Sequence, residues 1–256
     1  GRELLKKKGR TIRMRVGDPI PPEKLARFGG DRELIDYLRV RTCLLGEEDR
    51  DRHTLENRTV VTAAPKPIVP PVPREELEEE VGALAPDQRL AANGEMEVWL
   101  APAERIPRIL HEIGRLREFS FRAVGEGTGA AIDLDSFDRY YQHLFVWHRG
   151  EGAVVGAYRL GRTDEIVRSR GVQGLYTSTL FRFNRQLLSQ IAPAVELGRS
   201  FVQPRYQQSY TPLLLLWRGI GRYVVENPEC TGLFGPVSIS NDYHDLSRRL
   251  MVSYLT

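Results

Sequence analysis

The spacing of apolar side chains predicts an α/β fold for the C-terminal part of the chain. Alternating or continuous apolar runs predict strands that begin near Met96 and at 143–147, 153–160, 195–202 and 231–239. Apolar residues three and four positions apart predict helices over 106–116, around 185–191 and over 212–225. Strands and helices in this order predict a mixed sheet with helices on both sides.

The first 45 residues have a different character. Residues 11–16 alternate apolar and basic side chains, which predicts a half-buried strand, and 22–45 predict two short helices around Gly29 and Gly30. One strand and two short helices cannot close a core alone. Because the chain also opens with Gly1, we expect it to be a fragment whose first residues are the tail of an upstream domain.

A proline-rich stretch follows. The prolines from Pro65 to Pro73 predict an extended connector within 46–75, for which a linker is the default and a ligand for a signalling domain the alternative. An acidic helix is predicted over 74–84, with its apolar residues on one face. The expected domains are therefore 1–45, 46–94 and 95–256.

Composition narrows the function only modestly. The chain is 41% hydrophobic and 28% charged, as in ordinary globular proteins, and its net charge of +3 does not favour nucleic acid. Residues 2–15 hold seven lysines and arginines against one glutamate, which suits an anionic membrane surface, an acidic partner or a plain solvated face. The longest apolar run, 213–217, is far too short for a membrane span. Cys43 and Cys230 lack metal or redox spacing and are expected to be reduced, buried thiols.

The stretch 195–221 holds the most informative candidate chemistry. A strand with Glu196, Gly198 and Arg199 runs into a polar turn and then an apolar helix with Pro212 in its first turn. A helix N-terminus presents unpaired N–H groups, which favour an anionic ligand. Glu196 is the best single candidate for a general base, and a salt bridge to Arg199 is the structural alternative.

An acidic loop supplies the second constellation. Asp133, Asp135 and Asp138 are spaced so that two carboxylates could hold an ammonium group or take its proton. On pattern alone the favoured interpretation is that Asp135 and Asp138 cap a turn and a helix. The preceding residues 125–129 form a glycine-rich bend after Arg117 and Arg122, without a P-loop or dinucleotide spacing. No metal-ligand spacing is present, so no metal is expected.

Taken together, several blocks resemble one family over residues 95–256. They are RLREFSFRAVGEGTG, DLDSFDRYYQHLFVW, VVGAYRLG, VELGRSFVQPRYQQSY, LLLLWRGIG and LFGPVSIS. In this order they resemble the ornithine-lipid-type N-acyltransferases, often called hemolysin-like, of the GNAT superfamily. They are also similar to the acyl-homoserine-lactone synthases, through the three aspartates and the strand Gly156–Leu160. The resemblance implies a GNAT-like, mostly antiparallel mixed sheet flanked by helices, with a small N-terminal strand-plus-helix appendage.

Residues 1–45 resemble a different family, the C-terminal end of the glycerolipid (lysophospholipid) acyltransferases. The segments GRTIRMRVGDPIPPEKL and LIDYLRVRTCLL carry this resemblance. That family's catalytic motif, a His followed five positions later by Asp, is absent. The resemblance implies a natural fusion of an O-acyltransferase with the N-acyltransferase that follows.

The first resemblance also implies a reaction. A fatty acyl group, most often 3-hydroxyacyl, would pass from acyl carrier protein to the amino group of an amino acid, ornithine by resemblance, as the first step of aminolipid synthesis. Asp135 and Asp138 would hold that amino group, and Glu196 would remove its proton directly or through water. The expected substrate-binding residues are Arg122, Glu126, Asp133, Arg159 and Arg199. Arg159 and Arg199 could fix the acceptor carboxylate or brace the acidic loop.

The donor site is expected at the end of strand 195–202. The residues expected to contact the donor are Phe201, Val202, Arg205, Gln207 and Tyr210. GNAT enzymes bind the coenzyme A pyrophosphate with a glycine-containing loop, whereas the turn 203–210 has no glycine. This departure favours the phosphopantetheine thioester of acyl carrier protein over acyl-CoA. The alternatives are a CoA-dependent GNAT acetyltransferase and a non-catalytic carrier- or lipid-binding module. The expected location is the cytoplasm, peripheral on the inner face of an anionic membrane.

Overall fold

The computed structural model of the chain describes residues 19–39, 41–42, 64–183, 193–238, 247–248 and 250–251. The chain divides into a unit Ala64–Tyr243 and a second unit, Gly1–Ala63 with His244–Thr256. In the second unit, α2 (Pro22–Leu25) and a helix over 31–39 confirm the two short helices predicted there. The strand predicted at 11–16 and Cys43 lie outside the described residues.

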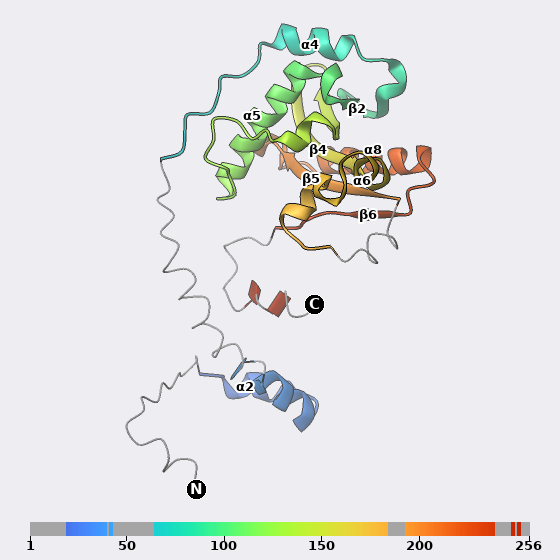
Figure 1. The fold of residues 1–256 in the computed structure, drawn as a ribbon. Helices are drawn as coiled ribbons and strands as arrows, with labels where there is room; N and C mark the ends of the chain where they lie inside the picture. The colour runs from blue at the N-terminus through green and yellow to red at the C-terminus, as the bar shows by residue number, and fades with distance from the viewer. Residues whose placement is uncertain are drawn as a thin grey trace. The chain divides into compact units, whose positions relative to one another are not determined.

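The unit Ala64–Tyr243 is built on one six-stranded sheet. Its strands are β1 (Arg89–Asn93), β2 (Met96–Pro102), β3 (Gln142–His148), β4 (Ala153–Arg162), β5 (Ala194–Val202) and β6 (Gly232–Phe234). They lie side by side in chain order, antiparallel from β1 to β5, and β6 pairs with β5 in parallel (Figure 1). The mixed, mostly antiparallel sheet is therefore confirmed.

Helices cover both faces of this sheet. The α-helices of this unit are α4 (Arg74–Gly82), α5 (Pro107–Ala123), α6 (Thr163–Arg170) and α8 (Thr211–Glu226). Short 3₁₀ turns join them: η1 (Pro86–Gln88), η2 (Ala103–Arg105), η3 (Ser136–Arg139), η4 (Val172–Gly174), η5 (Tyr176–Thr179) and η6 (Pro204–Tyr206).

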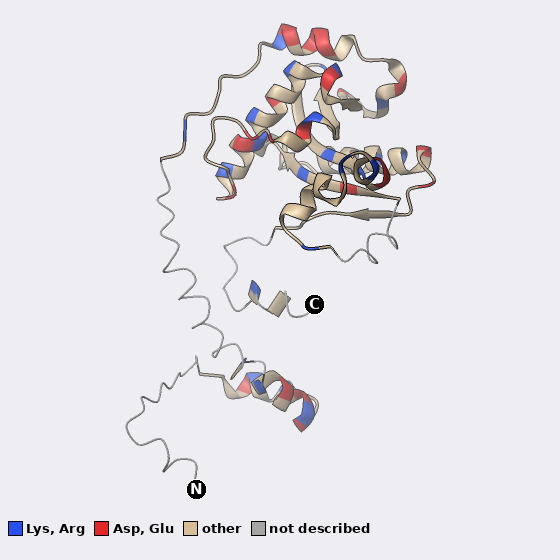
Figure 2. Ribbon diagram, viewed as in Figure 1, with Lys and Arg blue, Asp and Glu red and all other residues tan. Residues whose placement is uncertain are grey.

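Alternation along β3 shows how the sequence separates the two layers. Phe145 and Trp147 are buried in one cluster with α4 and α5, whereas Leu144 and Val146 are buried in another with α8. Neighbouring side chains on a strand point to opposite faces, so a continuous apolar run fills both layers at once. Acidic residues occupy most of α4 outside its buried Leu77 (Figure 2).

The proline-rich segment 64–73 is attached to this unit by hydrogen bonds. Lys66 N–H donates to the Gly129 carbonyl at 2.9 Å, and Val69 N–H donates to the Ala131 carbonyl at 3.0 Å. Val72 N–H donates to Glu112 Oε2 at 3.2 Å, and its side chain packs against the α5 core cluster. We call residues 64–73 the strap, because they cross the glycine-rich loop and hold it against α5.

Several elements differ from the predicted pattern. β1 and α6 carry little apolar periodicity and were not predicted, and β6 is shorter than the strand predicted at 231–239. The helix predicted around 185–191 lies outside the described residues. Cys230 is a buried free thiol, as expected. Among the residues that the structure describes, no helix combines the length and apolar character needed to cross a bilayer.

Candidate active site

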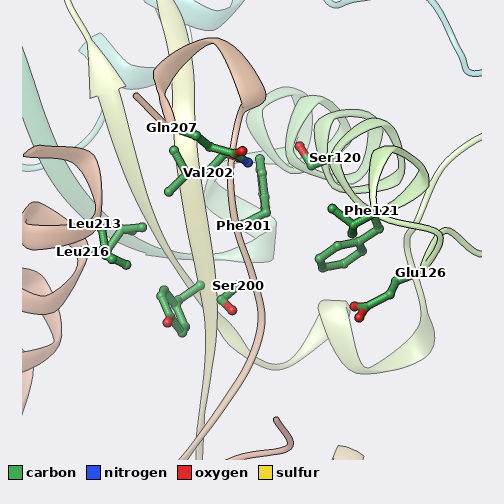
Figure 3. Close-up of a pocket in the computed structure, with 11 residues that line it drawn as sticks. Ser120, Phe121, Glu126, Ser200, Phe201, Val202, Gln207, Leu213 and Leu216 are labelled. Atoms are coloured by element: carbon green, nitrogen blue, oxygen red, sulfur yellow. The ribbon is translucent and has the colours of Figure 1, made fainter. Parts of the chain in front are cut away.

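Two adjoining cavities open beside β5. The smaller, about 290 Å³, lies between the end of α5 and the start of α8, and the larger, about 1080 Å³, extends toward β6. Both are lined by Phe121, Glu126, Tyr158 and Ser200, so these residues lie between the two cavities. In Figure 3, Phe121 and Glu126 project from the α5 side toward Ser200 and Phe201 on the facing strand.

An irregularity between β4 and β5 produces this opening. Ala157 pairs with Phe201, but Arg159 pairs with Gly198, so β5 carries one extra residue over that interval. Arg199 lies within it and has a left-handed backbone with φ of 50°, which is uncommon for a residue other than glycine. Such a β-bulge bends its strand and interrupts the ladder. Strained backbone at a cavity wall is a feature of functional sites.

Three arginines and three aspartates form a largely buried cluster behind the cavity. At its centre Asp138 accepts hydrogen bonds from Arg117 Nη1 and Arg159 Nη1, both at 3.1 Å. Burial opposes the charge on Asp138, but attraction by Arg117 and Arg159 outweighs it and lowers the pKa of this carboxyl. Burial lowers the pKa of Arg117, partly offset by its aspartate neighbours.

The other two aspartates complete this Arg–Asp cluster. Asp135 pairs with Arg159 at 2.7 Å and with Arg199 at 3.5 Å. Asp133 Oδ2 accepts from Arg199 Nη1 at 3.3 Å, and burial raises the pKa of the Asp133 carboxyl. Three cations therefore face three anions, and each aspartate carboxylate has an arginine partner. These pairings leave no spare negative charge in the cluster for an ammonium group.

The same aspartates also cap η3. Asp135 Oδ1 accepts from the N–H groups of Phe137 at 2.9 Å and Asp138 at 3.2 Å, and Asp138 Oδ2 accepts from Asp135 N–H at 2.8 Å. The capping interpretation of the acidic loop is confirmed. Each of the two side chains thus holds the backbone turn and an arginine at once.

Aromatic rings enclose the guanidinium of Arg159. Its central carbon lies 5.6, 5.1 and 4.9 Å from the ring centres of Phe137, Tyr141 and Tyr176. Nε and Nη2 are buried without a hydrogen-bond partner among the described residues. Cation–π attraction from these rings replaces part of the lost hydration. Arg159 is 1% exposed and does not line the cavities, so it braces the acidic loop.

Glu196 is buried just behind the cavity wall. Its carboxylate accepts from the Tyr141 hydroxyl, from Tyr176 N–H at 3.2 Å and from Thr177 N–H at 2.6 Å. Burial and the nearby carboxylate raise the pKa of Tyr141. Tyr176 lines the large cavity, whereas Glu196 does not. Glu196 therefore holds the N-terminal end of η5, and Tyr176 lies between its carboxylate and the cavity.

Three of the five expected donor-site residues line the smaller cavity: Phe201, Val202 and Gln207. Arg205 instead pairs with Glu151 at 3.0 Å, and Tyr210 is 90% exposed outside the lining. Ser120, which was not predicted, contributes a buried Oγ without a partner among the described residues to the same cavity. The smaller cavity thus has mainly apolar walls with a few polar side chains among them.

The glycine-rich loop is fixed by a residue that the sequence did not single out. Glu118, fully buried on α5, accepts from Thr128 N–H at 3.0 Å and from Gly129 N–H at 2.9 Å. Arg122, expected to bind substrate, donates to Glu118 at 2.7 Å and to the Ala130 carbonyl at 2.6 Å. Burial opposes the charge on Glu118, but these hydrogen bonds outweigh it and lower its pKa.

Arg117 is the other important residue missing from the expected site. It is 1% exposed and continues the buried stripe of α5, four residues after Ile113. An arginine at a position where an amphipathic helix should place an apolar side chain signals a buried ion pair. That signal was present in the sequence. Within the described ranges, no group of three His, Cys, Asp or Glu side chains is arranged to hold a metal ion.

His143 gives the cluster a measurable pH dependence. It is buried beside Asp138, whose carbonyl lies 2.9 Å from Nε2, and burial lowers the pKa of His143 from 6.5 to about 4. The unfolded chain binds this proton more readily, so the stabilising effect is complete above pH 6.5 and is lost as pH falls toward 4. We expect a loss on the order of a few kcal/mol across that window.

Urea unfolding at several pH values measures this effect. His143→Gln keeps a polar side chain that cannot titrate, so its stability should fall less steeply between about pH 6.5 and 4. The difference between the two curves reports His143 together with its interaction with Asp138. Parallel curves for the two proteins would contradict the assignment.

Part of the chain matches a known family. Residues 116–217 match the family described as acetyltransferase (GNAT) domain. The match spans the end of α5, the acidic loop, β3 to β5 and the start of α8, which are the elements that build the site.

The chain is also homologous to named enzymes. It is 34% identical over 201 residues to the glycine N(alpha)-acyltransferases of Bacteroides thetaiotaomicron and Phocaeicola vulgatus, covering 73% of this chain and 59% and 61% of those proteins. It is 32% identical over 141 residues to the L-ornithine N(alpha)-acyltransferase of Brucella abortus, covering 51% of this chain and 48% of that protein. The chain spans about three fifths of the glycine N-acyltransferases it matches.

Proposed function

We propose that this protein transfers a fatty acyl group from a thioester to the amino group of a small amino acid, with glycine as the preferred acceptor. The observation that carries this proposal is the space of the two adjoining cavities beside the β4–β5 opening, lined mostly by the segment that matches the GNAT domain. Its larger part, about 1080 Å³, has walls rich in apolar side chains and has room for an acyl chain together with a small acceptor.

The reaction balances without a further reactant. The amine nitrogen attacks the thioester carbonyl carbon, the C–N bond forms, and the C–S bond breaks to release the thiol. The acceptor starts as an ammonium ion and loses one proton before attack and one after it. One of these protons ends on the leaving sulfur, and the other passes to a base or to water.

We take acyl carrier protein as the donor, with a 3-hydroxyacyl group on its phosphopantetheine arm. The smaller cavity supports a narrow arm, because its volume is about 290 Å³ and apolar side chains from α5, β5 and α8 line it. Arg205 is engaged with Glu151, and the turn 203–210 has no glycine to cradle a pyrophosphate. These features favour a donor with one phosphate over coenzyme A.

Glycine is proposed over ornithine as the acceptor because the site has few free negative charges for a second ammonium group. The aspartates that would neutralise a second ammonium group are paired with arginines in the Arg–Asp cluster. An unpaired ammonium group in a cavity of this kind is costly. Glycine is also the acceptor named for two of the relatives, and ornithine for the third. Ornithine is therefore the second candidate acceptor.

The place of this reaction is also a proposal. N-acylation of an amino acid with a long chain makes a lipid precursor, which would be the first step of aminolipid synthesis. A product of this kind partitions to membranes, so we propose peripheral association with an anionic membrane surface, aided by the basic residues 2–15. The fusion to a glycerolipid acyltransferase stays a prediction from residues 1–45.

Assays that combine each acyl donor with each acceptor test the proposal. The whole chain is mixed with 3-hydroxyacyl carrier protein, the matching acyl-CoA or acetyl-CoA, each with single amino acids, and N-acyl products are followed by mass spectrometry. We expect acylglycine from the carrier-protein donor, with kcat/KM about tenfold or more above acyl-CoA. No acylated amine from any amino acid would contradict the proposal. Preference for acetyl-CoA would support the acetyltransferase alternative, and carrier-protein binding without turnover would support a binding module.

A further inference from the structure

We infer that Glu126 and Arg199 bind the two charged groups of the acceptor zwitterion in the large cavity. Glu126 takes the ammonium group and Arg199 takes the carboxylate. This inference rests on the proposed function and names the chemical class of ligand that the cavity selects, a free α-amino acid. It assigns the ammonium group to a loop residue outside the Arg–Asp cluster.

The first observation is which charged side chains line the cavity. Among the described residues that line its 1080 Å³ part, Glu126 and Arg199 are the only charged side chains. The remaining wall is mainly aromatic and aliphatic, including Tyr158, Phe181 and Trp217. One anion and one cation in an otherwise apolar space match a ligand with one charge of each sign. An acyl chain needs neither of them.

Glu126 has a fixed backbone and an unpaired carboxylate. Its N–H donates to the Phe121 carbonyl at 2.8 Å, and two residues later the loop is fixed by Glu118 through Thr128 and Gly129. The side chain is exposed and makes no ion pair with any described residue. Figure 3 shows it projecting from the α5 side of the cavity. A rigid loop with a free carboxylate can bind an ammonium group with little loss of order.

Arg199 retains binding capacity although it contacts two aspartates. Its distances to Asp133 and Asp135, 3.3 and 3.5 Å, are long for charged pairs. Its Nε has no partner among the described residues. The side chain lines the large cavity and is 20% exposed. A planar guanidinium held at long range can still bind a ligand carboxylate.

The other acids are poorly placed for this role. The aspartates of the cluster neutralise arginines and hold η3, and Glu196 accepts three hydrogen bonds behind Tyr176. Because the cavity has no second described acid, the side-chain ammonium of ornithine would find no partner there. We expect kcat/KM for ornithine to be roughly 10- to 100-fold below that for glycine.

Glu126→Gln tests the inference, because it keeps the shape and removes the charge. We expect the KM for glycine to rise roughly 10- to 100-fold, with the KM for the acyl donor unchanged within about twofold. Glu126→Asp should recover part of the loss. Glu75→Gln is the matched control, since Glu75 is an exposed glutamate on α4, far from the cavity lining.

Saturation-transfer NMR with glycine supplies a readout that needs no turnover. Bound glycine in the wild type and in Glu75→Gln, but not in Glu126→Gln, supports the inference. An unchanged glycine KM and NMR signal in Glu126→Gln overturns it while leaving the proposed function intact. A wild-type protein that acylates no amino acid and shows no bound glycine overturns both. Turnover restricted to non-zwitterionic amines overturns the Arg199 half.

Discussion

Replacing Asp138 by alanine should destabilise the protein by about 3–5 kcal/mol, the largest effect expected from any single change in this site. The substitution leaves Arg117 and Arg159 buried without their shared carboxylate, and it removes the side chain that accepts from Asp135 N–H. Denaturation by urea, monitored by tryptophan fluorescence, measures the loss. Asp138→Asn should lose less, because it keeps the shape and part of the hydrogen bonding.

An exposed ion pair provides the control for this change. Glu95 lies 3.7 Å from Arg149, and both side chains are more than half exposed. Solvent screens such a pair, so Glu95→Ala should cost less than about 1 kcal/mol. If Asp138→Ala lowered the free energy of unfolding no more than Glu95→Ala does, the Arg–Asp cluster would not be what stabilises the acidic loop.

The second large effect concerns turnover. If Glu196 is the base of the proposed reaction, Glu196→Gln should lower kcat by about 100-fold or more, while both KM values change only a few-fold. Because the carboxylate lies behind Tyr176, the proton would reach it through water. Steady-state kinetics with each substrate varied in turn measure kcat and the two KM values.

Glu196 also holds η5, so the two roles need separation. An amide in place of the carboxylate sets a donor against the N–H group of either Tyr176 or Thr177, which should cost about 1–3 kcal/mol of stability. Tyr141→Phe removes a hydrogen bond to Glu196 and leaves its carboxylate in place, so it serves as the comparison. Near-wild-type turnover by a folded Glu196→Gln would rule out the base.

The elements that the sequence predicted are those whose apolar side chains recur with the spacing that burial requires. β3 and α5 were predicted because their apolar spacing is set directly by the layers they fill. α6 was missed because among its eight residues the apolar side chains are Ile166 and Val167, of which only Ile166 is buried. β1, with the sequence RLAAN, lies at the sheet edge, where pairing depends on its neighbour β2 more than on its own side chains.

Site residues were predicted individually, but their partners were not. The aspartate spacing correctly indicated caps, yet nothing local to the loop shows that Arg117, Arg159 and Arg199 converge on it from α5, β4 and β5. Those pairings arise from the register of antiparallel strands and from one bulge. The charge balance that leaves Glu126 as the unpaired cavity acid is therefore a property of the tertiary fold.

The strap has a consequence for the order in which the molecule assembles. Its hydrogen bonds to Gly129 and Ala131 join residues about 60 positions apart in the chain, whereas β3 and β4 pair through a short hairpin. Contacts between distant residues close large loops and form slowly. The glycine-rich loop, and with it Glu126, would then be organised after the β3–β4 hairpin. Docking of the strap onto this loop would be the last step before the cavity can bind an acceptor.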